Sequence, residues 1–175
     1  MRCIVRLVLT VVISVMPRPL PATATAPVPI DPDRLCAGYR TAAVVVDTRH
    51  RTLVLCANSA AVQSFRVALG VGGLGKRRAG DNRTPLGTYP LGAPRGSTQF
   101  GMFIPVGYPT PAQVRAGFTG HAVGIHGPLR AYVGAGSSNT ATDWTAGCIA
   151  VGSDEEIGSI ATWLRADGPV SVHIQ

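Results

Sequence analysis

Two short segments of the sequence contain the side chains best suited to covalent chemistry. Cys148 follows Gly147 and leads into an apolar run, so a tight turn would present its sulfur at the start of a strand. His126 ends a predicted strand, and the carbonyl of Gly127 could accept a hydrogen bond from its ring. A thiol becomes nucleophilic when a nearby base takes its proton, and that base needs a group that holds its ring. The backbone N–H groups of Gly147 and Cys148 could stabilise an oxyanion. We therefore predict a cysteine nucleophile; the alternative is that Cys148 is a buried structural thiol.

The first 26 residues are typical of a secretory signal peptide. A basic start precedes the apolar run Leu7–Met16, and small residues follow up to Ala26. The run is too short to span a bilayer, so we expect cleavage after Ala26 and no stable membrane span afterwards. An uncleaved membrane anchor is the alternative interpretation. We expect an exported protein of the periplasm or cell envelope.

Cysteine usage agrees with export. Loss of residues 1–26 would remove Cys3 and leave Cys36, Cys56 and Cys148. Cysteines tend to pair in an oxidising compartment, and an odd one is either intermolecular or reactive. Cys36 and Cys56 flank a predicted hairpin and could bridge its ends, which would leave Cys148 free.

The charge of the chain argues against nucleic acid as a partner. Three of the 16 basic residues and none of the nine acidic ones fall in residues 1–26, so residues 27–175 carry a net charge of +4. This balance suits an acidic polymer, but it is too mild and scattered for nucleic-acid binding. The four histidines are dispersed and no zinc-binding spacing is present, so we expect no zinc site.

A glycine-rich stretch, Gly70–Lys76, matches the start of a phosphate-binding loop, but we reject nucleotide binding. The next residue is Arg77, where such a loop needs Ser or Thr to hold magnesium. The residues that follow do not predict a helix whose N-terminus could face a phosphate. We interpret the stretch as a flexible loop beside a site.

The remaining pattern predicts one mainly β domain over residues 42–175, preceded by a linker and N-terminal segment over 27–41. A substantial C-terminal helix is expected from Asp154 to about Ala166, with Ser153 and Glu156 as a capping box. A candidate short helix starts at Pro111, and residues 128–147 are expected to form a long loop. We predict strands over residues 42–47, 51–55, 62–71, 88–91, up to 126, and from 169 to 175.

Three segments resemble the L,D-transpeptidase catalytic domain family (YkuD-type). They are Ile125-His126-Gly127, Gly147-Cys148-Ile149 and, upstream, Gly80–Tyr89 with its Thr-Pro-Leu-Gly motif. The resemblance covers about residues 42–175 and implies a β-sandwich-like fold with a cleft. It further implies that Cys148 attacks the amide before the terminal D-residue of a peptidoglycan stem peptide, with His126 as base oriented by Gly127. No metal or cofactor is implied.

The chain also departs from the family pattern. The family usually has Ser-His-Gly-Cys followed by Arg, whereas this chain has Thr145-Ala146-Gly147-Cys148-Ile149, which resembles a divergent D-W-T-x-G-C branch of cross-linkers and wall hydrolases. Asp143, Trp144 and Thr145 are candidates to shape the cleft, or they form an ordinary turn. Arg83 either contacts substrate carboxylates or lies in a solvated loop. Three functions stay open: a transpeptidase, a related amide hydrolase that cuts stems or wall-protein linkages, and a catalytically weak wall-binding domain.

Overall fold

The computed structural model describes residues 30–168 and 170–175. The predicted signal peptide, residues 1–26, lies outside this range. Within it, no helix is long and apolar enough to cross a membrane. The elements in chain order are α1 (Pro32–Cys36), β1 (Ala43–Asp47), β2 (Thr52–Ala57), β3 (Ala60–Ala68), β4 (Gly87–Pro90), β5 (Arg95–Ser97), β6 (Gly101–Pro105), α2 (Pro111–Arg115), β7 (Gly124–His126), η1 (Arg130–Thr140, 3₁₀), β8 (Ile149–Val151), α3 (Asp154–Asp167) and β9 (Ser171–Ile174).

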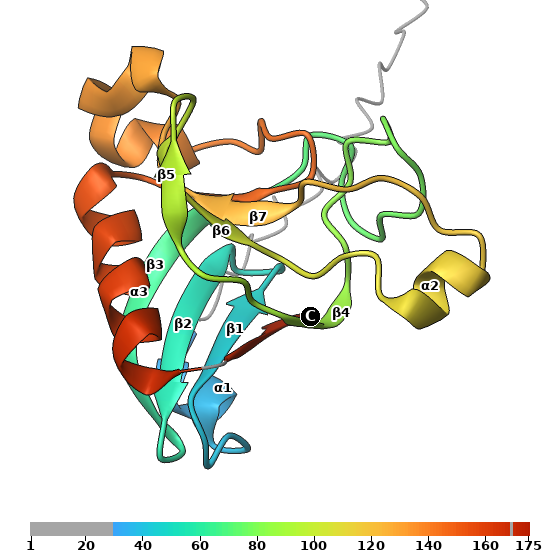
Figure 1. The fold of residues 1–175 in the computed structure, drawn as a ribbon. Coiled ribbons are helices and arrows are strands. Elements are labelled where there is room, and N and C mark those ends of the chain that lie inside the picture. The colour runs from blue at the N-terminus through green and yellow to red at the C-terminus, as the bar shows by residue number, and fades with distance from the viewer. Residues whose placement is uncertain (1–29, 169) are drawn as a thin grey trace, which may run out of the picture.

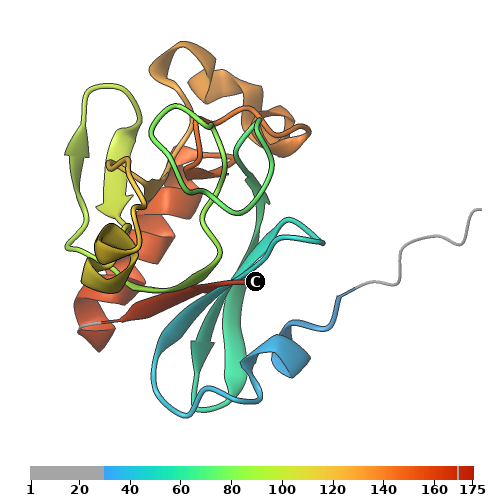
Figure 2. The same cartoon turned by 90° about the vertical axis from the view of Figure 1, so that its right-hand side faces the viewer.

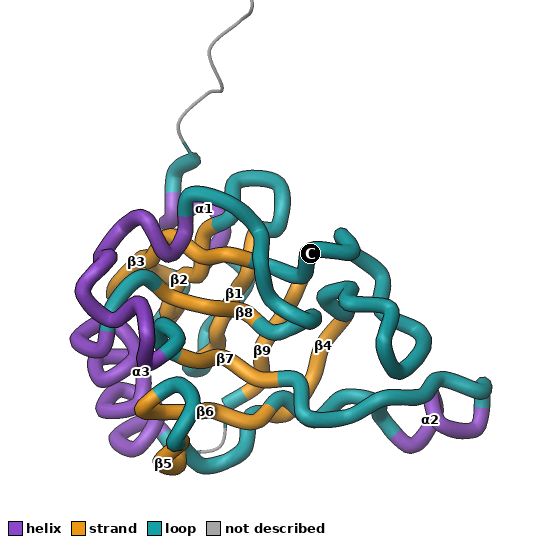
Figure 3. Tube along the Cα trace, turned by 90° about the horizontal axis from the view of Figure 1, so that it is seen from above, coloured by secondary structure: helices purple, strands orange, loops and turns teal. Residues whose placement is uncertain are grey.

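The strands form one curled sheet of nine in the order β4-β9-β1-β2-β3-β8-β7-β6-β5. Most neighbours are antiparallel, but β1 pairs with β9 and β7 with β8 in parallel. Helix α3 lies beside the sheet, as Figure 1 shows. Its apolar residues Ile157, Ile160 and Leu164 join the main core. Figure 3, seen from above, shows β3, β8, β7 and β6 one after another toward the edge of the sheet at β5. The predicted mainly β fold with one substantial helix is confirmed.

Helix α3 begins where the sequence predicts, but only half of its expected capping box forms. The Ser153 hydroxyl accepts a hydrogen bond from the Glu156 N–H at 3.2 Å. The Glu156 carboxylate instead accepts the N–H of Gly152 at 2.7 Å. The complete capping box lies on α2, between Thr110 and Gln113. The reciprocal bond in α3 is lost because a closer backbone donor competes for the Glu156 side chain.

Strands β1 and β2 are buried on both faces, which explains their unbroken apolar runs. One face joins the main core, and the other contributes Val45 and Val54 to a second small core. Helix α1 covers that second face, as the blue segment of Figure 2 shows. A disulfide between Cys36 and Cys56, which are 20 positions apart in the sequence, links α1 to β2.

Two segments are more ordered than the sequence indicates. Helix α1 lies inside the expected linker, where Asp31 caps it and Asp33 accepts the N–H of Ala61 at 2.8 Å. The expected long loop contains the 3₁₀ turns of η1, and an ion pair between Arg130 and Asp154 ties their start to α3. Both differences depend on partners more than 20 positions away in the chain, which local patterns do not reveal.

Candidate active site

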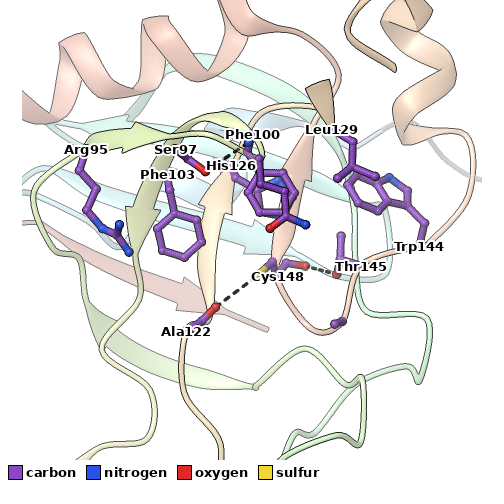
Figure 4. Close-up of a pocket in the computed structure, with 12 residues that line it drawn as sticks. Arg95, Ser97, Phe100, Phe103, Ala122, His126, Leu129, Trp144, Thr145 and Cys148 are labelled. Atoms are coloured by element: carbon purple, nitrogen blue, oxygen red, sulfur yellow. Dashed lines mark hydrogen bonds between the residues drawn. The ribbon is translucent and has the colours of Figure 1, made fainter. Parts of the chain in front are cut away.

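The pairing of β7 with β8 brings Cys148 and His126 to the same face of the sheet. Ile125 lies opposite Ile149 in this parallel pair, and both side chains are fully buried in the core. Because side chains alternate along a strand, His126 and Cys148 must point to the other face, at diagonal positions on adjacent strands. Both line a cleft with a volume of about 520 Å³ (Figure 4).

The imidazole of His126 is held in one orientation by the backbone and by aromatic rings. Its Nδ1 lies 2.7 Å from the carbonyl oxygen of Gly127. A carbonyl can only accept, so Nδ1 carries the proton and Nε2 is left as the basic nitrogen. Phe100 stacks on the ring with centroids 3.8 Å apart, and Trp144 approaches edge-on at 5.7 Å.

Burial sets the protonation of this histidine. His126 is 1% exposed. The loss of hydration lowers its pKa to about 4, although the hydrogen bond to Gly127 acts in the opposite direction. The ring is therefore neutral at neutral pH and able to accept a proton.

Cys148 sits at the end of a turn that Thr145 organises. The buried Thr145 hydroxyl donates to the carbonyl of Cys148 at 2.7 Å and accepts the N–H of Gly147 at 3.1 Å. The Thr145 backbone also bonds to Leu69 and Val71, just beyond β3. These contacts fix the position from which the sulfur enters the cleft.

Gly147 is required by the geometry of this turn. Its φ of 118° lies in the left-handed region, and a Cβ at this position would lie 2.5 Å from the carbonyl oxygen of Arg83. Its N–H donates to the Thr145 hydroxyl at 3.1 Å and is therefore engaged within the turn in this structure. Of the two backbone donors considered, the N–H of Cys148 stays a candidate.

The thiol of Cys148 is half-buried and neutral at rest. Burial raises its pKa, while the N–H of Gly124 and the charge of Lys76 act to lower it. Its Sγ lies 3.6 Å from the carbonyl oxygen of Ala122 and donates there (Figure 4). Proton transfer to His126 therefore requires the S–H to turn away from Ala122. The site therefore combines a neutral thiol with a neutral imidazole.

Ala122 is a cleft residue that the sequence analysis missed. It lines the cleft and has a φ of 59°, a conformation that residues with a Cβ rarely adopt. Such strained positions are frequent at functional sites. Its local sequence, Gly120-His121-Ala122, contains no signal beyond the preceding glycine.

Asp143, a candidate to shape the cleft, and Arg83, a candidate contact for substrate carboxylates, are not among the residues that line the cleft. The Asp143 carboxylate binds Arg51, with Nη2 to Oδ2 at 2.8 Å, and accepts the N–H of Leu69 at 2.9 Å. The bond from Arg51 lowers the pKa of Asp143, against the effect of burial. The Arg83 guanidinium points to the carbonyl of Leu74 at 3.3 Å. In this structure the side chains of Asp143 and Arg83 are therefore held by partners outside the cleft.

Trp144 and Thr145 do line the cleft. The indole N–H of Trp144 donates to the carbonyl of Asn139 at 2.8 Å, which anchors the ring beside His126. This bond also connects η1 to the cleft wall. The two residues therefore shape the site in different ways, Trp144 with its ring and Thr145 through the turn.

The glycine-rich loop, Gly70–Lys76, packs closely against residues 81–84. A Cβ on Gly70 would lie 2.4 Å from the carbonyl of Asn82, and one on Gly72 would lie 2.3 Å from that of Asp81. Thr84 closes the loop by accepting the N–H of Gly70 at 2.8 Å. The glycines are thus explained by close backbone packing, and the next regular element is a strand, β4.

The loop also contains a buried ion pair that was not predicted from the sequence. Lys76 is 5% exposed, and its ammonium lies 2.7 Å from Oδ1 of Asp81. Burial by itself would raise the pKa of Asp81, but the bonds from Lys76 and three backbone N–H groups hold that pKa well below its usual range. Lys76 and Asp81 are five positions apart, and this spacing does not predict whether the two charges are buried as a pair or exposed to solvent.

Comparison with known proteins identifies the family of the chain. The L,D-transpeptidase catalytic domain family matches residues 41–172, and the chain belongs to this family. No curated protein matches the chain.

Solved structures show the same fold at low identity. Pgp2 of Campylobacter jejuni, a helical cell shape determining protein, superposes with a TM-score of 0.63 at 22% identity, over 77% of this chain and 47% of that one. Bd1075 of Bdellovibrio bacteriovorus gives a TM-score of 0.55 at 17% identity, over 79% and 48%. This chain spans about half the length of each.

Proposed function

We propose that this protein is a peptidoglycan L,D-transpeptidase that works through a thioester on Cys148. The observation that supports it best is the placement of Cys148 and His126 on one face of adjacent parallel strands, in one cleft. The substrate would be the stem peptide of peptidoglycan, and the site of action the cell envelope. The mild positive charge of residues 27–175 suits an anionic polymer.

The first half-reaction forms the acyl-enzyme. Sγ of Cys148 attacks the carbonyl carbon that precedes the terminal D-residue of a donor stem, and the thiol proton passes to Nε2 of His126. The C–N bond then breaks, and the departing amine takes that proton from His126. The N–H of Cys148 is the candidate donor to the oxyanion, a contribution of about 3 kcal/mol for such groups.

The second half-reaction transfers the acyl group. The amine of a second stem attacks the thioester carbonyl and gives a proton to His126, which returns it to Sγ as the C–S bond breaks. The resting protonation states fit this sequence, because a neutral His126 can accept a proton in each half-reaction.

The test is incubation of the protein with purified tetrapeptide muropeptides and analysis of products by mass spectrometry. Cross-linked dimers, absent with Cys148→Ala, would support the proposal. If shortened monomers were the only products, the activity would be hydrolysis through the same acyl-enzyme, and the proposal of cross-linking would be wrong. If no product and no covalent adduct at Cys148 formed, the chemistry proposed for this site would be refuted.

A further inference from the structure

A row of three side chains crosses the cleft from its outer edge to the catalytic histidine. Arg95 on β5 lies opposite Phe103 on β6, and Phe103 lies opposite His126 on β7. Residues directly opposite each other in a sheet share a face, so all three point into the cleft. Figure 4 shows Arg95 at one end, beside Phe103, with His126 and Cys148 further in and Trp144 on the far side.

Arg95 is the one formally charged side chain among the described residues that line the cleft. Its guanidinium lies over the Phe103 ring, 5.0 Å from the centroid, and the side chain is exposed. Across residues 30–168 and 170–175, no carboxylate forms an ion pair with it, whereas Lys76 is paired with Asp81 and Arg51 with Asp143. Arg95 is therefore a positioned cation that lacks an internal counter-ion.

The distance from this cation to the reacting groups suits a short peptide. The centroids of Phe103 and His126 are 6.3 Å apart, so the guanidinium carbon lies at most about 11 Å from the imidazole. An extended chain rises about 3.4 Å per residue. A carboxylate within two or three residue lengths of the scissile amide can therefore reach Arg95 while that amide meets Cys148.

The strand that carries the nucleophile cannot supply such a cation. The residues after Cys148 are Ile149 and Ala150, and both are fully buried. Any anionic group of a ligand in this cleft must find its counter-charge on another element. Arg95, on the edge strand β5, provides it.

We propose that Arg95 is the carboxylate receptor of this cleft and binds a free carboxylate of the donor stem peptide. The inference rests on the proposed function for the identity of the ligand. A guanidinium suits the task because its planar N–H groups can donate two parallel hydrogen bonds to one carboxylate. Phe103 limits the orientations of that plane by its cation–π contact. The carboxylate is either that of the terminal residue or one on the side chain of the third residue.

The experiment measures binding, so that it does not depend on turnover. The full chain with Cys148→Ala is titrated by calorimetry with three synthetic stem peptides whose third residue has a side-chain carboxylate. One is unmodified, one is amidated at the terminal carboxylate, and one is amidated at the side chain. The titrations are repeated with Arg95→Gln added. Arg77→Gln is the matched control, because Arg77 also lies over an aromatic ring, Phe118, at 5.4 Å but does not line the cleft.

We expect Arg95→Gln to weaken binding of the unmodified stem by about tenfold or more, and Arg77→Gln to leave it unchanged. With the Cys148→Ala protein, one of the two amidated stems should bind more weakly than the unmodified stem by a similar factor. Adding Arg95→Gln should not weaken the binding of that amidated stem further. The stem that behaves in this way identifies which carboxylate Arg95 binds. Unchanged binding with Arg95→Gln, or equal losses for all three stems, would overturn the proposal. Binding as expected without turnover of stems by the protein with Cys148 intact would contradict the proposed function alone.

Discussion

Replacement of Asp81 by asparagine should destabilise the loop behind the nucleophile. Oδ1 of Asp81 accepts from the Lys76 ammonium at 2.7 Å and from the Arg83 N–H at 3.1 Å. Oδ2 accepts from the N–H groups of Arg77 and Arg78 at 2.8 and 2.9 Å. An asparagine has one oxygen and one NH₂ group. Whichever way the amide turns, its NH₂ faces two donors.

The magnitude follows from the burial of Lys76. Removal of one partner of a buried ion pair costs about 3–5 kcal/mol. We expect the lower end, about 3 kcal/mol, because the Asp81 side chain is 19% exposed and the Arg78 carbonyl still accepts from Lys76. In a chain of this size, each 1 kcal/mol lowers Tm by about 2–4 °C. Asp81→Asn should therefore lower Tm by roughly 6–12 °C.

The effect should depend on pH in a defined direction. The pKa of Asp81 in the folded state lies below its unfolded value of about 3.9. Its contribution to stability is therefore fully present above that value and is lost as the pH falls toward the folded-state pKa. The Tm difference between wild type and Asp81→Asn should be constant near neutral pH and shrink below about pH 4.

Thermal unfolding followed by circular dichroism tests this prediction. Asp167→Asn serves as the control, because Asp167 is exposed on α3 and forms no ion pair within the described part of the chain. Lys76→Met combined with Asp81→Asn should cost less than the sum of the two single changes. If Asp81→Asn unfolded within about 0.5 kcal/mol of wild type, the reasoning from the buried pair would be refuted.

Three further changes test the site and the fold. Burial raises the pKa of the Cys148 thiol and lowers that of His126 to about 4, so the rate at which iodoacetamide labels Cys148 should be low at pH 6 and still increase above about pH 8.5. A labelling rate that reached its maximum by pH 6 would contradict a neutral thiol beside a neutral imidazole. Thr145→Val keeps the side-chain size but removes two hydrogen bonds of the nucleophile turn, so Tm should reflect a loss of about 2 kcal/mol and kcat on muropeptides should fall about tenfold; an unchanged kcat would show that the turn needs no hydroxyl. Reduction of the Cys36–Cys56 disulfide should cost about 3 kcal/mol and lower Tm, without a change in Cys148 labelling; equal Tm values for oxidised and reduced protein would exclude this contribution.

The elements with strong local signals were predicted from the sequence. Helix α3 has a capping serine, an apolar face and a terminal glycine within 16 residues, and its bounds agree with the prediction to one residue. The hairpin β1–β2 was equally visible, because both strands are buried on two faces and consist almost entirely of apolar residues. Short strands such as β5, with the sequence Arg-Gly-Ser, have no pattern of their own and form only because β6 lies beside them.

The residues of the candidate site were also predicted only in part. Cys148 and His126 were selected from residue chemistry, from their glycine neighbours and from the family resemblance, and the sheet brings both to one cleft. The partners of Asp143 and Arg83 were not predicted, because a charged side chain in a sequence does not reveal its partner. Arg95 was overlooked because its role depends on Phe103, which lies across a strand pair.

By itself, the sequence determined which groups could react and which segments could form helices and strands, since both depend on residues close together in the chain. Only the tertiary structure decided which of those groups meet. The parallel pairing of β7 with β8 joins residues 24 positions apart, and the same pairing decides which side chains face the core and which face the cleft. Register between distant strands is a property of the packed sheet, and no local pattern encodes it.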